Sequence, residues 1–144
     1  MTLHSEHPLV VTALDIATRA HGTQAVNRLI RVASRLTDPH DQVVALLHAV
    51  TGETTMTGAT LYDDGIPVEL IMDVAALTRK PGEPYKMFLN RVHANGPRPV
   101  RVKAAVVADR LDPAVLATLP VEEQARILAA HALNVAMLTA RTAA

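Results

Sequence analysis

The sequence contains no cysteine and no tryptophan, and it has very few other aromatic residues. Without cysteine, neither a disulfide nor a thiolate metal site can form, which suits a cytoplasmic protein. Aromatic residues make up only 2% of the 144 residues, whereas apolar residues make up 49%. The core must therefore be built from Ala, Val, Leu, Ile and Met, the side chains typical of packed helices. This composition favours an all-α fold.

An excess of one charge and long apolar runs are also missing. Fourteen basic and fourteen acidic residues cancel, and the basic residues are scattered, so the pattern argues against a nucleic-acid partner. The N-terminal apolar run is interrupted by Asp15 and Arg19 and follows no basic segment, which argues against a signal peptide or a membrane span. We therefore expect a cytoplasmic protein that binds neither nucleic acid nor membrane. A homo-oligomer is left open.

Apolar residues at helical spacing recur along the chain, with Gly and Pro between them. We expect helices over 8–20, 23–36, 38–50, 66–78, 85–94, 100–111 and 120–140, and a short helix that runs through 61–62. An Asp-Pro helix start is expected at Asp38 and again at Asp112. The last predicted helix carries Val121, Ala125, Ile127, Leu128, His131, Val135 and Leu138. The expected fold is a single domain over residues 1–144, a compact bundle of eight or nine helices.

One histidine stands apart from the other six. His48 ends the most apolar predicted helix in the segment VVALLHAVTGETT, residues 43–55, and Glu53 follows just beyond it. A helix this apolar is expected to be central, so His48 should lie in a pocket. The dipeptide His40-Asp41 sits instead at a helix start, and Asp41 lies roughly 10 Å from His48 along the helix, too far for both to bind one ion.

Five segments together carry a resemblance to a known family. They are ATRAHG, RVASRL, VVALLHAVTGETT, GIPVELIMDVAALTRKPGEPYKMFLNRV and VRVKAAVVADRLDP, within residues 11 to about 118. In this order the chain resembles small HD-superfamily proteins related to the hydrolase domain of RelA/SpoT-type guanosine tetraphosphate enzymes. The similarity to the family's motifs is greatest in LTRKPGEPY and in RVKAA with DRLDP after it. The resemblance implies an HD-domain-like helical bundle.

The resemblance also implies where a metal site would lie, and that it has been lost. In the family, histidines and carboxylates hold a divalent ion that activates a water molecule. The matching positions here are Arg28, His48, Ala49, Gly52, Glu53 and Val106, so only His48 remains among the four ligands. An arginine at a ligand position would repel a cation. We therefore predict a metal-independent pseudoenzyme with no metal or other cofactor.

Several polar residues would still face the inherited pocket. His48 and Glu53 are the candidate catalytic residues, and the candidate ligand-binding residues are Arg28, Lys103, Asp109 and Arg110. The resemblance places Lys103 at a family lysine and Arg110 at a family asparagine that meets the nucleotide sugar. Asp109 lies near the position of the lost aspartate, but three residues further along the helix.

Three functions remain open at this stage. The favoured one is a non-hydrolytic module that binds an anionic small molecule, a nucleotide or a protein. The second is a metal-independent enzyme in which His48 acts as acid or base while Arg28 holds an anion. The third is a residual phosphohydrolase acting on guanosine tetraphosphate or another phosphate ester through substitute ligands. Because a fold does not establish an activity, the sequence leaves open whether the protein is an enzyme.

Overall fold

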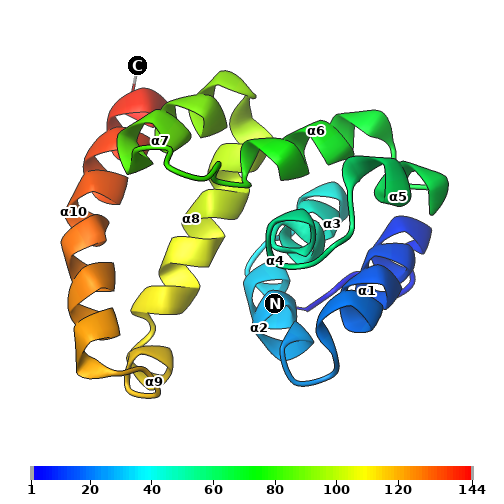
Figure 1. Ribbon diagram of the computed structural model, residues 1–144, viewed down its shortest axis with the longest axis horizontal. Helices are drawn as coiled ribbons and strands as arrows, with labels where there is room; N and C mark the ends of the chain where they lie inside the picture. The colour runs from blue at the N-terminus through cyan, green and yellow to red at the C-terminus, as the bar shows by residue number, and fades with distance from the viewer. Residues whose placement is uncertain (1, 144) are drawn as a thin grey trace.

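The computed structural model describes residues 2–143, with side chains described through His131 and at Asn134 and Val135. Its helices are α1 (Pro8–His21), α2 (Val26–Ser34), α3 (Pro39–Leu47), α4 (Val50–Glu53), α5 (Gly58–Asp63), α6 (Val68–Ala76), α7 (Tyr85–Ala94), α8 (Pro97–Leu111), α9 (Pro113–Leu116) and α10 (Val121–Ala143) (Figure 1). Over residues 2–143 there is no strand. The predicted all-α bundle is confirmed, with α4 and α9 as single turns of four residues.

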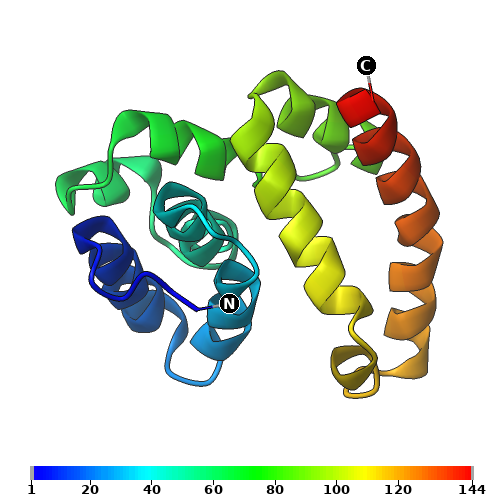
Figure 2. The same ribbon diagram turned by 180° about the vertical axis from the view of Figure 1, so that it is seen from behind.

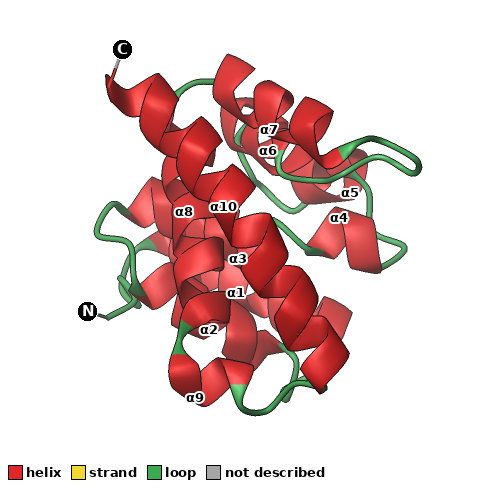
Figure 3. Cartoon of the chain, turned by 90° about the vertical axis from the view of Figure 1, so that its left-hand side faces the viewer, coloured by secondary structure: helices red, strands yellow, loops and turns green. Residues whose placement is uncertain are grey.

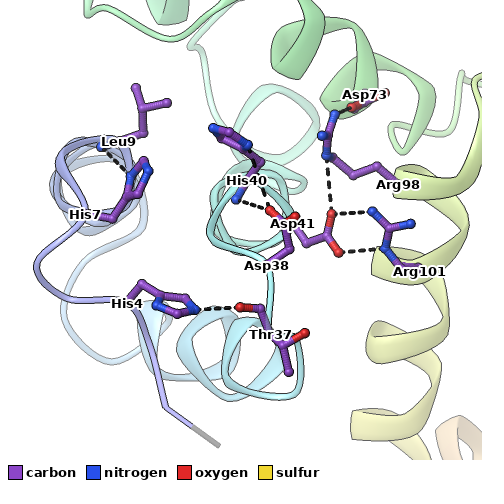
Figure 4. Close-up of polar contacts among 10 residues, drawn as sticks. All are labelled: His4, His7, Leu9, Thr37, Asp38, His40, Asp41, Asp73, Arg98 and Arg101. Atoms are coloured by element: carbon purple, nitrogen blue, oxygen red, sulfur yellow. Dashed lines mark hydrogen bonds and ion pairs between the residues drawn. The ribbon is translucent and has the colours of Figure 1, made fainter.

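Local sequence explains several helix starts. The Asp38 carboxylate accepts a hydrogen bond from the His40 amide, and Pro39 follows as the first residue of α3. Asp112 caps α9 in the same way. At α1 the cap is His7, whose Nδ1 accepts the Leu9 amide at 3.2 Å (Figure 4). A side chain that accepts an orphan amide proton stabilises the first turn.

Several predicted helix boundaries were wrong. The helix predicted over 23–36 begins only at Val26, after a turn, and the helix predicted over 38–50 ends at Leu47. The helix predicted to begin at residue 100 already begins at Pro97. The reason is that residues in the first turn of a helix need no partner for their amide, so proline is accepted there.

Helix α3 forms the centre of the fold. It packs against α1, α2, α6 and α8, and every residue from Asp41 to Leu47 is buried. Its apolar character on all sides therefore follows from having neighbours on all sides. The prediction that this helix is central is confirmed.

Two polar residues inside α3 tie distant segments to it. Gln42 accepts the His4 amide at 2.8 Å and donates to the carbonyl oxygens of Thr2 and Leu36, which holds the N-terminal segment in place. Asp41 accepts two hydrogen bonds from Arg101, at 2.7 and 2.9 Å. Both residues are almost fully buried, so these bonds satisfy groups that water cannot reach.

The Asp41 cluster extends to a third helix. Arg98 lies 3.3 Å from the Asp41 carboxylate and 3.0 Å from that of Asp73 on α6 (Figure 4). The carboxylate in the dipeptide His40-Asp41 therefore joins α3 to α8, and Arg98 joins both to α6. The role that the structure assigns to Asp41 is structural.

Helix α10 lies at the outer edge of the molecule. It packs against α7 and α8, and α8, α9 and α10 follow one another down one side and up again (Figures 1 and 2). The view from the side of α10 places it in front of α8 (Figure 3). Within the described residues, no helix combines the length and apolarity needed to cross a membrane.

Several apolar residues of α10 are exposed. Val121, Ala125, Leu128 and Val135 are exposed, whereas Ile127 and His131 are half-buried. Because α10 has helical neighbours on one side only, it can bury only part of an apolar pattern this broad. Leu138 lies outside the residues whose side chains are described.

Candidate functional site

A cavity of about 330 Å³ opens where α3 ends. From the first half of the chain its wall includes Arg28, His48, Ala49, Gly52 and Glu53, and from α8 it includes Lys103, Val106 and Arg110. These are the positions that the family resemblance assigns to metal ligands and to the nucleotide. Three segments far apart in the sequence thus meet at one hollow, which we call the polar cavity.

His48 is half-buried and stands directly after the last residue of α3. Its Nδ1 lies 2.6 Å from the carbonyl oxygen of Ala45. A carbonyl oxygen only accepts hydrogen bonds, so Nδ1 carries the proton in the neutral ring and Nε2 keeps its lone pair. The orientation suits a hydrogen-bond acceptor or a proton acceptor.

Burial sets the charge of His48. Burial, together with the positive charges of Arg28 and Lys103, lowers the pKa of the ring from 6.5 to about 4, against the raising effects of the Ala45 carbonyl and of Glu53. At neutral pH the ring is therefore uncharged.

Glu53 and Arg28 lie at the rim of the cavity. The Arg28 guanidinium donates to the Glu53 carboxylate at 3.2 Å, and His21 Nδ1 lies 3.9 Å from the same oxygen. The side chains of Arg28 and Glu53 are 39% and 53% exposed, so this pair contributes at most about 1 kcal/mol to stability. Either side chain can turn toward a ligand at little cost.

Lys103 is the least exposed cation of the cavity, at 7% exposure. Its ammonium lies 5.3 Å from the ring centre of Tyr85 and 5.2 Å from that of Phe88. Burial lowers its pKa to about 8, and the nearby charges of Arg110 and Arg79 act in the same direction. Lys103 is therefore still mostly protonated at neutral pH, and no carboxylate within the described part of the chain forms an ion pair with it.

Two further residues of the wall were missed by sequence reasoning. Arg79 lies over the ring of Tyr85 at 5.5 Å, and its Nε donates to the Glu83 carbonyl at 2.9 Å. Both Arg79 and Tyr85 belong to LTRKPGEPY, which is among the segments most similar to the family, but neither residue was among the predicted site residues. The similarity of this segment to the family was the sequence feature that could have identified both residues. Among the described wall residues, four cations thus face one carboxylate: Arg28, Arg79, Lys103 and Arg110 face Glu53.

The structure corrects the placement of Asp109. Its carboxylate is buried and accepts two hydrogen bonds from Arg31, at 3.2 and 3.3 Å, with Arg35 at 3.7 Å. It is not part of the wall of the polar cavity. Three residues beyond Val106, the helical rotation turns the side chain toward α2 instead. Asp109 joins α8 to α2 and lies outside the described wall of this cavity.

The donor set of the polar cavity does not fit a divalent cation. Its described wall offers one imidazole and one carboxylate, surrounded by positive charge that would repel the ion. Elsewhere in the described residues, no group of three or more histidine or acidic side chains is arranged to hold a metal. Compared with protein-family models and with curated proteins, the chain gives no match.

Proposed function

We propose that the protein is a degenerate HD-type domain that binds an anionic small molecule in the polar cavity, without metal-dependent hydrolysis. The resemblance is supported by geometry, since the positions it assigns to the family's site, chosen from the sequence alone, line one cavity. On the composition argument given above, we also propose a cytoplasmic location.

The observation that carries this proposal is the burial of the Lys103 ammonium without a carboxylate partner among the described residues. A buried ammonium is costly unless it is paired, and two aromatic faces compensate only in part. Arg79 and Arg110 line the same wall and add like charge. An anion placed among these three groups would supply the missing counter-charge and accept charge-assisted hydrogen bonds. A phosphate or a carboxylate group on the ligand meets this need.

His48 supports a second candidate function, a metal-independent enzyme. Because Nδ1 donates to Ala45, a lone pair remains on Nε2, which could accept a proton from a bound substrate. With a pKa of about 4 the ring is a weak base in the free protein. Binding of an anion next to it would raise that pKa. The third candidate, residual phosphohydrolysis, needs a metal that the described donors do not suit.

Calorimetric titration of the metal-free protein with pyrophosphate and ethyl phosphate tests the proposal. We expect binding at pH 7, and a loss of at least tenfold in affinity for Lys103→Met. Lys86→Met is the matched control, because Lys86 is an exposed lysine on α7 that is not on the described wall. Binding should weaken from pH 7 to pH 9 as Lys103 loses its proton near pH 8. Lys103→Arg should remove this pH dependence, because arginine stays charged.

Two results would overturn the proposed binding, and two others would favour another function. If neither anion binds, or if both lysine variants lose affinity equally, the proposed binding is wrong. Release of phosphate from a phosphate ester without metal, abolished by His48→Ala, would favour the metal-independent enzyme. Release that requires added Mn²⁺ would favour the residual phosphohydrolase.

A further inference from the structure

A second cavity, of about 490 Å³, adjoins the polar cavity. It lies between α8 and α10, next to the start of α7, and we call it the α10 cavity. Arg79, Tyr85, Lys103 and Arg110 line both hollows. The two cavities therefore share one wall, and that wall carries three cations.

Away from the shared wall, the α10 cavity is mainly apolar. Its lining there includes Val107, Leu111, Ile127, Ala129 and Ala130. The other two charged residues of the lining, Glu123 and Arg126, are paired with each other. They leave no net charge to be neutralised. An occupant of this cavity needs an apolar surface, and it needs a negative charge only at the shared wall.

A hydrogen bond holds the shared wall in place. The Tyr85 hydroxyl donates to Asn134 Oδ1 at 2.6 Å, which ties the start of α7 to α10. The ring that is fixed in this way also packs against the Lys103 ammonium. The part of the shared wall formed by Tyr85 and Lys103 is therefore positioned in advance of binding, which lowers the cost of ordering it around a ligand.

We propose that the ligand is an amphipathic anion, a phosphate ester whose charged group binds Lys103, Arg79 and Arg110 at the shared wall while its alkyl or aryl group fills the α10 cavity. This inference rests on the function proposed above and names its ligand class. A phosphate monoester carries close to two negative charges at neutral pH. Three cations match it better than they match the single charge of a carboxylate. The cavity volume lies within the range of roughly 300–1,000 Å³ that is usual for small-molecule sites.

Titration with inorganic phosphate and with ethyl, butyl and hexyl phosphate tests this ligand class. In the unmodified protein we expect affinity to rise about two- to fourfold with each added methylene, because each one leaves water for an apolar wall. Hexanoate should bind at least tenfold more weakly than hexyl phosphate.

Two variants of α10 locate the apolar group. Ala130→Phe fills the α10 cavity from its wall, so affinity for inorganic phosphate should stay within about twofold while the gain with chain length is lost. Ala125→Phe adds the same ring to the same helix, at an exposed alanine that is not on the described lining of the α10 cavity. In this control variant, affinity should still rise with the length of the alkyl chain. Ile127→Asn, which makes the wall polar, should reduce the gain and serves if Ala130→Phe does not fold.

The outcomes separate this inference from the proposed function. If phosphate compounds bind but affinity does not rise with chain length, the ligand class is wrong and the anion site stands. A gain that persists in both Ala130→Phe and Ile127→Asn would place the apolar group elsewhere and overturn the inference. Equal binding of hexanoate and hexyl phosphate would overturn the phosphate assignment. If no phosphate compound binds, both proposals fail.

Discussion

At the scale of single residues, burial acts on two bases of the polar cavity with opposite consequences. It lowers the pKa of His48 to about 4 and that of Lys103 to about 8. At neutral pH the first is therefore an uncharged acceptor and the second is still a cationic donor. One environment thus presents a lone pair and a positive charge to the same occupant.

The lowered pKa of His48 predicts a loss of stability in mild acid. In the unfolded chain the ring takes up a proton near pH 6.5, whereas the folded protein resists protonation down to about pH 4. The unfolded state therefore binds more protons in this window, and stability falls as the pH falls through it. From pH 7 to pH 5 we expect His48 to reduce the free energy of unfolding by about 2 kcal/mol, measured by urea denaturation.

His48→Gln isolates this effect, because a glutamine amide can still donate to the Ala45 carbonyl but does not titrate. The other six histidines are present in both proteins, so their contribution cancels in the comparison. Between pH 7 and pH 5, the free energy of unfolding of the variant should fall by about 2 kcal/mol less than that of the unmodified protein. An identical pH dependence in both proteins would show that His48 is protonated freely in the folded state.

At the scale of helices, buried charge decides how α8 is attached. One end of α8 is held to α3 through Asp41 and Arg101, and the other end is held to α2 through Asp109 and Arg31. These ion pairs hold in place the helix that carries Lys103 and Arg110. The position of Lys103 and Arg110 in the shared wall thus depends on two carboxylates, Asp41 and Asp109, that are not part of that wall.

Asp41→Asn should lower the free energy of unfolding by about 2–3 kcal/mol. The substitution keeps the shape of the side chain but removes the charge that Arg98 and Arg101 share. This loss of stability is smaller than the loss expected when one partner of a fully buried ion pair is removed. The reason is that the Arg101 side chain is 48% exposed and can turn to water. Urea denaturation at pH 7 measures the loss of stability.

Asp63→Asn provides the comparison for Asp41→Asn. Asp63 is exposed at the end of α5, so its substitution should change stability by less than about 0.5 kcal/mol. Equal stability of the Asp41 variant and the unmodified protein would mean that the cluster in Figure 4 contributes no net stability.

At the scale of the whole molecule, the attachment of α10 decides whether the α10 cavity exists. This helix packs mainly against α7 and α8. The partly buried hydrogen bond between Tyr85 and Asn134 is one polar link in this interface. Loss of this bond should therefore increase local opening of α10 more than it increases opening of the core.

Tyr85→Phe should destabilise the protein by about 1–2 kcal/mol, because Asn134 Oδ1 would stay buried without its donor. Hydrogen exchange should become faster for amides of α10, while the amides of α3 keep their relative protection. Tyr62→Phe is the control, since Tyr62 is 61% exposed and its change should leave both measurements as they are. Equal acceleration in α3 and α10 would show that the two helices open together.

The sequence by itself determined the features that depend on neighbours within a turn or two of the chain. The caps at Asp38 and Asp112, the helical class and the central place of α3 could all be predicted from local pattern. The family resemblance also selected cavity residues from distant segments, such as Arg28, His48 and Lys103. Their chemistry was predicted only in outline, because charge and burial at a site depend on what surrounds it.

Only the tertiary structure decided which face of a helix is covered, and by what. Asp109 turns to Arg31 and away from the polar cavity, although it follows Val106 by only three residues. Arg79 and Tyr85 join the wall because α7 packs against α8, and the α10 cavity forms because α10 packs against both. Such contacts join residues far apart in the chain, so the physical forces that select them act between helices and leave no local pattern.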